Sequence, residues 1–296
     1  MQTPLSPRPD KSHKGDFGSV GVIGGAPGMA GAVLLAARAA LCLGAGRVYG
    51  GLLDTRVAVD PAAPELMLTT PEAVLSLSPP SCLIIGPGLG KSAEALTLLK
   101  KALHSTLPLL IDADALNLIA AHPVLMHQVA RREATTLLTP HPGEAARLLG
   151  IATVQTDRET AVHALQRRSR AIVILKGAGT LIAAPPENFA HSSEAAAQAA
   201  SCVLWADPEG RGDPCIWQNA SGNPGMATAG MGDVLSGMIA ALIAQGIHPV
   251  EAACHGVWLH GRAADQCVLD GIGPLGLTAS EVAHCARSLL NGSKSG

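Results

Sequence analysis

A glycine-rich segment that ends at one carboxylate is the part of this chain best suited to chemistry. Residues 222–233 read GNPGMATAGMGD, and apolar residues at helical spacing follow at once. The pattern predicts a buried helix that begins near Asp233, and a helix N-terminus offers unpaired N–H groups and a partial positive charge. Gly230 and Gly232 carry no Cβ, so a phosphate has room to approach the backbone N–H groups there. The segment therefore predicts an anion site beside Asp233.

Asp233 has two interpretations. Aspartate is a favoured N-cap residue, so the carboxylate alone is compatible with a purely structural role. Beside a phosphate site, the same carboxylate would serve as a general base that deprotonates a hydroxyl attacking the phosphoryl group. The glycines that precede Asp233 favour catalysis.

Two further segments offer polar groups beside turns. LKGAGT, residues 175–180, is a glycine turn after an apolar run, with Lys176 available to a phosphate. TPHPGE, residues 139–144, displays His141 between two prolines, which makes it a better candidate for ligand contact than most histidines. Glu144 would hold Mg²⁺ through water or favour a helix N-terminus. Each of these signals is weak when it is taken alone.

Other polar residues have structural interpretations. Asp112 and Asp114, in DADALN, are expected to serve turn and capping chemistry. His255 and His260 are spaced H-x₄-H on an expected helix without a third ligand, which indicates packing. GGAPGMAGA, residues 24–32, lacks the G-x-G-x-x-G spacing of a Rossmann fingerprint, and no Walker A sequence occurs.

Short apolar strands that alternate with helical patterns are expected to position these groups. Strand-like apolar runs begin the segments 19–25, 82–90, 108–119, 136–150 and 171–184. Each run leads into a turn rich in Gly, Pro or Asp, and the segments 108–119 and 136–150 continue into a helical pattern. Pro142 suits a first helical turn and Gly150 a helix C-cap. Such a pattern is typical of a mainly parallel α/β sheet with helices on both faces, in which ligands bind beyond the carboxyl ends of the strands. We expect one domain over 1–296, with an irregular tail at 1–12 and an insertion at 185–215.

Composition excludes several classes of function. The chain has 296 residues, 48% of them hydrophobic, and a formal net charge of −2. It has no long basic run and few aromatic residues, so we expect neither nucleic acid nor membrane as a partner. Its seven cysteines form no C-x-x-C pair, which indicates reduced thiols in a cytoplasmic protein. The N-terminus has no apolar segment typical of a secretion signal.

Taken together and in order, the motifs resemble the ADP/ATP-dependent NAD(P)H-hydrate dehydratase family of the ribokinase-like superfamily. The resemblance covers residues 13–290 and rests on HKGDFGSVGVIGG, GMAGA, IGPGLG, DADALN, TPHPGEAARLLG, LKGAGT and GNPGMATAGMGDVLSG. It implies a ribokinase-like fold and repair of the S-epimers of NADHX and NADPHX, which are NADH and NADPH hydrated on the nicotinamide ring. In this family ADP or ATP phosphorylates the added hydroxyl, phosphate then leaves, and the reduced cofactor is restored.

The resemblance also assigns roles to individual residues. Asp233 is similar to the catalytic base, and Gly230, Met231 and Gly232 to the anion hole. The positions that resemble nucleotide contacts are Lys176, Gly177, Ala178, Gly179, Thr180 and Gly232. Those that resemble hydrate contacts are Ala32, Gly88, His141 and Asp233. Glu144 falls where related kinases use a glutamate near Mg²⁺.

The resemblance further implies Mg²⁺ as cofactor, a homo-oligomer such as a tetramer, and a separate NAD(P)HX epimerase as a partner. One departure concerns the glycine-rich segment, where many members read GGTGD and this chain reads AGMGD, so that a hydroxyl contact is lost while a backbone anion hole survives. Two alternatives stay open: a ribokinase-like kinase of a vitamin precursor, and a non-catalytic nucleotide sensor. Retention of Asp233 disfavours the sensor.

Overall fold

The computed structural model describes residue 5 and residues 7–78, 81–185 and 215–292. In these ranges the strands are β1 Ser19–Gly24, β2 Arg47–Leu52, β3 Met67–Thr69, β4 Ser81–Ile85, β5 Leu109–Ile111, β6 Thr136–Leu138, β7 Ile172–Leu175, β8 Leu181–Ala184 and β9 Cys215–Gln218. The helices are α1 Ala30–Cys42, α2 Pro71–Leu75, α3 Ala93–Leu103, α4 Ala113–Ala121, α5 Val124–Ala130, α6 Pro142–Leu149, α7 Arg158–Ser169, α9 Met231–Ala244, α10 Pro249–Leu269 and α11 Ala279–Leu290. Short 3₁₀ turns occupy Lys14–Phe17 and Pro224–Met226.

All of these strands form one sheet in the order β3-β2-β1-β4-β5-β6-β7-β8-β9. Each pairing from β3 to β7 is parallel, whereas β8 and β9 add antiparallel strands at one edge. The central strands are buried along their whole length, which explains why they are continuously apolar rather than alternating. The mainly parallel α/β sheet expected from the sequence is confirmed.

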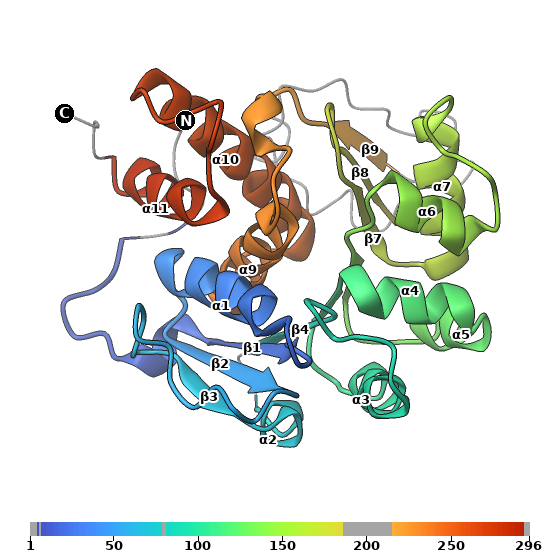
Figure 1. Cartoon of the computed structure of the whole chain (residues 1–296), viewed down its shortest axis with the longest axis horizontal. Helices are drawn as coiled ribbons and strands as arrows, with labels where there is room; N and C mark the ends of the chain where they lie inside the picture. Colours follow the sequence, from blue (N-terminus) through green and yellow to red (C-terminus); the bar gives the residue numbers. More distant parts are fainter. Residues whose placement is uncertain (1–4, 6, 79–80, 186–214, 293–296) are drawn as a thin grey trace.

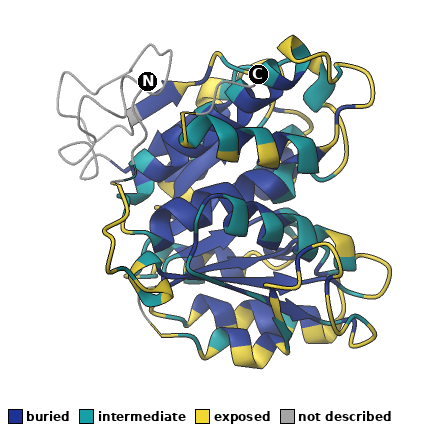
Figure 2. Cartoon of the chain, turned by 90° about the vertical axis from the view of Figure 1, so that its left-hand side faces the viewer, coloured by how far each residue is buried: buried dark blue, intermediate teal, exposed yellow. Residues whose placement is uncertain are grey.

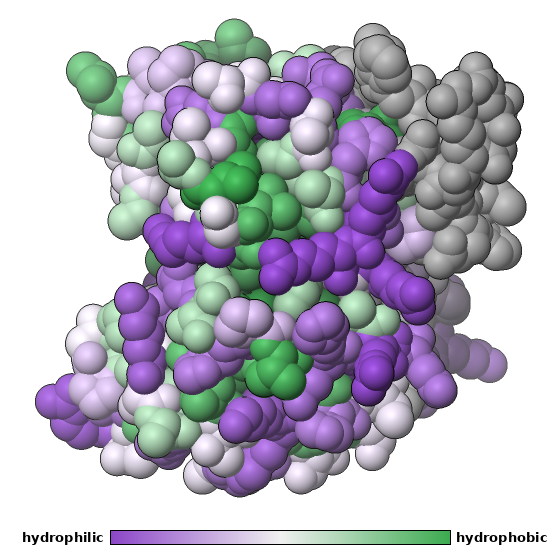
Figure 3. All heavy atoms as spheres, turned by 90° about the vertical axis from the view of Figure 1, so that its right-hand side faces the viewer, coloured by the Kyte–Doolittle hydropathy of each residue, from purple (hydrophilic) through white to green (hydrophobic). Residues whose placement is uncertain are grey.

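Alternate residues of the strands pack into two separate cores. Val20, Val22 and Ile84 face one core, formed with α1, α9, α10 and α11. Ile23 and Ile85 face the other, formed with the helices from α2 to α7. Figure 1 shows α1 and α2 on opposite sides of β1, β2 and β3, and Figure 2 shows the buried strands between helices whose outer surfaces are exposed. The face toward α5, α6 and α7, drawn in Figure 3, combines hydrophilic side chains with a hydrophobic area near its centre.

The strand order reverses direction between β1 and β4. From β1 the chain continues outward to β2 and β3, and then returns to pair β4 on the other side of β1. In open parallel sheets, such a reversal leaves a crevice beyond the carboxyl ends of the two strands. The loops after β1 and β4 meet there, because the N–H groups of Gly25 and Ala26 donate to the carbonyls of Pro87 and Gly88 at 3.0 and 2.7 Å.

Two features expected from the sequence lie wholly or partly outside the described residues. Nearly all of the expected insertion at 185–215 is there; β8 ends before it, and β9 begins at its last residue. Residues 7–12 of the expected N-terminal tail contain no helix or strand, and most of residues 1–6 are not described. Within the described ranges, no helix is long and apolar enough to cross a membrane.

Candidate functional site

Helix α9 begins inside the glycine-rich segment, two residues before Asp233. Its N-cap is Gly230, in the left-handed conformation at φ +86°, and Met231 is its first residue. A Cβ at Gly230 would lie 2.5 Å from Cδ1 of Leu35, so Leu35 would have to move to make room for a side chain, and the positive φ independently favours glycine. Asp233 is therefore in the first helical turn and is not the N-cap, which removes the structural interpretation offered by the sequence.

The carboxylate of Asp233 is left available for chemistry. Within the described chain it makes no hydrogen bond or ion pair, although it is partly buried. Burial raises its pKa to about 7, and the negative charges of Asp112, Asp114 and Glu144 add to the rise, while Lys176 opposes it. A carboxylate with a pKa near neutrality is well matched to the work of a general base.

Lys176 comes to the first turn of α9 from the end of β7. Its ammonium Nζ is 2.7 Å from Oδ1 of Asp112, and the hydroxyl of Ser236 donates to Oδ2 of the same carboxylate at 2.8 Å. A Cβ at Gly232 would lie 3.0 Å from Nζ, so the missing side chain leaves room for the lysine beside the anion hole. Burial lowers the pKa of Lys176, but Asp112, Glu144 and Asp233 raise it more, which keeps the amine charged.

The loop between β7 and β8 is anchored from outside by an arginine. The guanidinium of Arg158, at the start of α7, donates to the carbonyls of Leu175 at 3.0 Å, Lys176 at 3.2 Å and Ala178. The hydroxyl of Thr180 closes the loop by donating to the carbonyl of Gly177 at 2.9 Å. Because these carbonyls are hydrogen-bonded to Arg158 and Thr180, the backbone of the loop is held in one conformation.

A cavity of about 930 Å³ opens beside this loop. Of the residues singled out from the sequence, it is lined by His141, Lys176, Gly177, Ala178, Gly179, Thr180, Met231 and Gly232. Residues 218–224 and α10 complete its wall, and the volume suits a nucleotide. His260, which the sequence indicates as a packing residue, belongs to this wall, and its buried Nε2 has no hydrogen-bond partner among the described residues.

The segment 219–225 is held by α10. Asp265 accepts hydrogen bonds from the N–H of Gly222 at 3.0 Å and from Nδ2 of Asn223 at 3.1 Å. The Oδ1 atom of Asn223 in turn accepts from the N–H of Gly225 at 2.9 Å. The cavity wall on this side is therefore built by side chains of the chain itself before any ligand binds.

His141 and Glu144 form a capping box at the start of α6. Nδ1 of His141 accepts from the N–H groups of Gly143 and Glu144 at 3.0 and 3.3 Å, so the neutral ring carries its proton on Nε2. Burial, Lys176 and Arg147 lower the pKa of His141, which favours this neutral form. Oε2 of Glu144 accepts from the N–H of His141 at 2.8 Å. Pro142 opens α6 and Gly150 caps its end, as the sequence predicts.

Ala32 and Gly88 lie together beyond the carboxyl ends of β1 and β4, and neither lines the 930 Å³ cavity. A Cβ on Gly88 would be 3.3 Å from that of Ala32 and 2.6 Å from the carbonyl oxygen of Met29. Asp114 supports the same loop, since its Oδ2 accepts from the N–H of Gly90 at 2.9 Å. Of the positions that resemble hydrate contacts, Ala32 and Gly88 therefore lie apart from the cavity, whereas His141 lines it.

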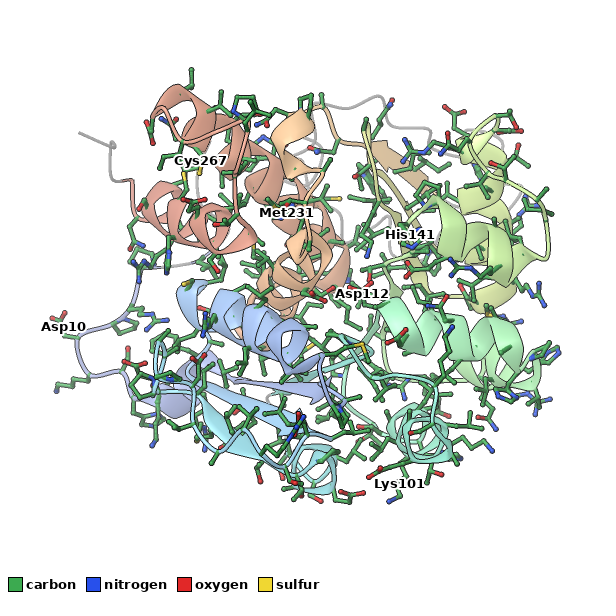
Figure 4. All side chains as sticks on the ribbon, in the orientation of Figure 1. Asp10, Lys101, Asp112, His141, Met231 and Cys267 are labelled. Carbon is green, nitrogen blue, oxygen red and sulfur yellow. The ribbon has the colours of Figure 1, made fainter. Side chains whose placement is uncertain are left out.

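Figure 4 shows that the centre of the site combines residues from distant parts of the sequence. The labelled Asp112, His141 and Met231, at the starts of α4, α6 and α9, lie around the middle of the molecule. Sequence reasoning missed the pairing of Asp112 with Lys176, as well as Ser236, Arg158 and Asp265. The DADALN motif contains Asp112 and gave a partial signal, whereas nothing in the sequence near Arg158 indicates its role.

The fold and this site define the class of protein. A ribokinase-like superfamily protein from Enterococcus faecalis aligns with a TM-score of 0.75 at 25% identity, covering 97% of this chain and 92% of that one. The ADP/ATP-dependent NAD(P)H-hydrate dehydratase of Bacillus subtilis, co-crystallised with ATP and Mg²⁺, aligns with a TM-score of 0.74 at 26% identity, covering 97% and 94%. The chain therefore has the ribokinase-like fold.

Sequence comparison narrows the class to one family. The sequence model of the NAD(P)H-hydrate dehydratases matches residues 20–202 and 208–284. The ADP-dependent (S)-NAD(P)H-hydrate dehydratase of Neisseria meningitidis is 41% identical, over 96% of this chain and 88% of that protein. The bifunctional NAD(P)H-hydrate repair enzyme of Escherichia coli is 39% identical over 97% of this chain, which spans 50% of that enzyme. The chain belongs to the NAD(P)H-hydrate dehydratase family.

Proposed function

We propose that this protein restores NADH and NADPH from the S-epimers of NADHX and NADPHX, with ADP or ATP as phosphoryl donor. The observation that carries the proposal is the position of Asp233. Within the described residues its carboxylate has no hydrogen-bond or ion-pair partner. It lies in the first turn of α9, whose Met231 and Gly232 line the nucleotide-sized cavity and whose N-cap Gly230 packs against Leu35, one turn along α1 from Ala32. A base that deprotonates a hydroxyl on one ligand to attack a phosphoryl group on another belongs beside such a cavity.

The chemistry divides into two steps. Asp233 takes the proton of the hydrate's hydroxyl, whose oxygen attacks the terminal phosphorus; the bond to the nucleotide's bridging oxygen breaks, and that oxygen keeps the electron pair. Phosphate, a far better leaving group than hydroxide, then departs with the electrons of the carbon–oxygen bond as the ring nitrogen's lone pair pushes it out. Loss of a proton from the neighbouring carbon restores the ring double bond.

The same proposal gives the residues of this chain a part in both steps. The N–H groups of Gly230, Met231 and Gly232 act as the anion hole, and the Lys176 ammonium neutralises charge on the transferring group. Gly177, Ala178, Gly179 and Thr180 contact the AMP portion of the nucleotide in the cavity. His141, whose Nε2 is 3.4 Å from Oε1 of Glu144, holds the hydrate together with Ala32 and Gly88.

We propose that Mg²⁺ enters with the nucleotide. The described residues contain no group of three or more His, Cys, Asp or Glu side chains able to hold a metal by themselves. That composition fits Mg²⁺, which is usually held by phosphates, waters and one or two carboxylates. Glu144 would hold it through a water molecule, and the bound ion would neutralise phosphate charge.

We also propose a cytoplasmic homo-oligomer, such as a tetramer, that works beside a separate NAD(P)HX epimerase. The bifunctional relatives support the pairing, because repair enzymes roughly twice as long as this chain occur in Escherichia coli and Coxiella burnetii. An epimerase would supply the S-epimer from the R-epimer.

The near-ultraviolet absorbance of reduced nicotinamide tests the function directly. NADHX is mixed with the protein, Mg²⁺ and either ADP or ATP, with Asp233→Asn in parallel. We expect the absorbance to return with wild type and to stay flat with the variant, and the faster nucleotide identifies the donor. Nucleotide binding without any return of absorbance would contradict repair; release of a stable phosphate ester would then indicate a kinase, and binding alone a sensor.

A further inference from the structure

We propose that Asp112 is a positioning residue of this site, and that its two carboxylate oxygens tie Lys176 to the first turn of α9 through Ser236. The inference rests on the proposed function and extends it to a residue outside the assigned contacts. Asp112 lies at the end of β5, Lys176 at the end of β7 and Ser236 inside α9, so one carboxylate joins three elements. Through it, the ammonium and the anion hole are held toward the same phosphoryl group.

The contacts are buried and use both oxygens. Asp112 is 1% exposed and Ser236 is fully buried. Oδ1 accepts from Lys176 Nζ at 2.7 Å and from the N–H of Ala113 at 2.8 Å, while Oδ2 accepts from Ser236 Oγ at 2.8 Å. Ser236 follows Asp233 by three residues and is therefore on nearly the same face of α9. A shift of Asp112 would move the lysine and the base relative to each other.

Capping of α4 does not by itself account for this arrangement. An N-cap side chain normally accepts from the second or third N–H of its helix, yet Asp112 reaches only the first, that of Ala113. Ala113 itself has φ +48°, a conformation that is uncommon outside glycine. The carboxylate is turned away from its helix and toward Lys176 and Ser236. Strained backbone of this kind is concentrated at functional sites.

The loop after β4 packs closely against the backbone of Asp112. Gly86, after β4, passes so close to the carbonyl oxygen of Asp112 that a Cβ there would lie 1.8 Å from it. The N–H of Asp112 donates to the carbonyl of Ile85 at 3.0 Å. The backbone of Asp112 is thus clamped by β4, which fixes where its side chain can point.

Two variants separate positioning from charge. Asp112→Asn removes the charge that faces Lys176, whereas Ser236→Ala removes one hydrogen bond and leaves every charge in place. We expect kcat to fall about a hundredfold in Asp112→Asn, because small misplacements at a reacting centre have effects of that size. We expect about a tenfold fall in Ser236→Ala, which loses a hydrogen bond to a charged group.

The pH dependence of kcat distinguishes this role from a merely structural one. The groups that act on Asp233 are Asp112, Asp114 and Glu144, which raise its pKa, and Lys176, which lowers it. Asp112→Asn should therefore move the acidic limb of the profile to lower pH, while Ser236→Ala leaves the limb in place. Asp60→Asn is the matched control, since Asp60 is a buried partner of Arg38 at 2.5 Å, away from this site.

The outcomes decide between the two proposals. Suppose that the wild type is active and that Asp112→Asn and Ser236→Ala lose only thermal stability, as Asp60→Asn is expected to. This result would overturn the positioning role of Asp112 and leave the proposed function intact. If Asp112→Asn does not fold, a Ser236→Ala kcat within about twofold of wild type overturns it. If wild type has no repair activity, the proposed function fails; NMR titration of Lys176 Nζ still tests the tie, because its pKa must then fall in Asp112→Asn.

Discussion

At the scale of single residues, the site depends on which carboxylates are engaged and which are free. Asp112 is occupied by Lys176 and Ser236, and Glu144 by the backbone of His141. Asp233 makes no such bond within the described chain, and burial in this acidic surrounding raises its pKa to about 7. Two of these three buried carboxylates thus support the structure, and the third is available as a base.

This division predicts the pH dependence of the reaction. Asp233 accepts a proton only when it is ionised, so kcat/KM should fall as the pH drops below about 7, by roughly tenfold for each further pH unit. A pH–rate profile with NADHX and ADP measures the limb. Glu72→Gln, which alters an exposed carboxylate on α2, should leave it unchanged. A limb near the ordinary pKa of aspartate would contradict the assignment.

At the scale of elements, helix starts and strand ends converge. Helices α4, α6 and α9 begin at the site, and the β7–β8 loop is shaped by an arginine from α7. The cap of each helix is different: Asp112 for α4, His141 for α6 and the side-chain-free Gly230 for α9. Only the last leaves its N–H groups without a side-chain acceptor, which is what an anion site requires.

Arg158→Lys tests the shaping of the nucleotide loop. Lysine keeps the charge but has no planar fork, so it cannot donate to three carbonyls in the same geometry. We expect the KM for the nucleotide and its calorimetric Kd to rise about tenfold with kcat nearly unchanged, since the hydrogen bonds that Arg158 makes within the described residues go to this loop. Arg168→Lys is the control, because Arg168 donates to the carbonyl of Leu148 at 3.0 Å, outside the loop. Equal effects from both variants would rule out the specific role.

Glu144→Gln tests the buried capping box of α6. Burial raises the pKa of Glu144 from 4.5 to about 7. Below pH 4.5 Glu144 is protonated in both the folded and the unfolded protein, so its burial does not lower the stability of the fold. As the pH rises from 4.5 to about 7, the unfolded chain releases this proton more readily than the folded protein does, and the wild type loses stability. Glutamine can still accept from the N–H of His141 and does not ionise. The variant should therefore gain stability over wild type between pH 4.5 and 7, reaching about 1–3 kcal/mol at pH 8.

Urea unfolding at pH 5 and pH 8 measures that gain. The matched control is Glu281→Gln, in the capping box of α11, where the hydrogen bonds of Thr278 lower the pKa of an exposed carboxylate. There the sign is opposite, and the variant should lose a little stability as the pH rises. A Glu144→Gln protein that is no more stable than wild type at pH 8 would show that burial of Glu144 is not costly.

At the scale of the whole molecule, the nucleotide cavity joins parts of the chain that are distant in sequence. Its wall combines the β7–β8 loop, residues 218–227, the start of α9 and the middle of α10. A ligand that contacts all of these binds the folded state and not the unfolded chain. Binding is therefore coupled to the stability of the C-terminal half of the fold.

ADP with Mg²⁺ should raise the melting temperature by several degrees. At a concentration about a hundred times its Kd, a ligand adds about 2.7 kcal/mol to the stability of the folded state. Asp233→Asn removes the base without narrowing the cavity, so it should show a shift of similar size while lacking activity. Differential scanning calorimetry measures both proteins, and a shift absent from the wild type would exclude this cavity as the nucleotide site.

The sequence by itself determined the local parts of this protein. Apolar runs predicted the parallel strands, the glycine-rich segment predicted the start of α9, and Pro142 and Gly150 marked the ends of α6. The family also followed from motifs in a fixed order. These signals are local because strand propensity, helix capping and close backbone approach depend on neighbouring residues.

Only the tertiary structure decided which side chains meet. Asp112 is 64 residues from Lys176 and 124 residues from Ser236, and no local pattern indicates either contact. The role of Arg158 depends likewise on α7 lying beside the β7–β8 loop. Even the state of Asp233 follows from tertiary burial and four distant charges. Such contacts are set by strand order and helix packing, which bring together residues that the chain keeps far apart.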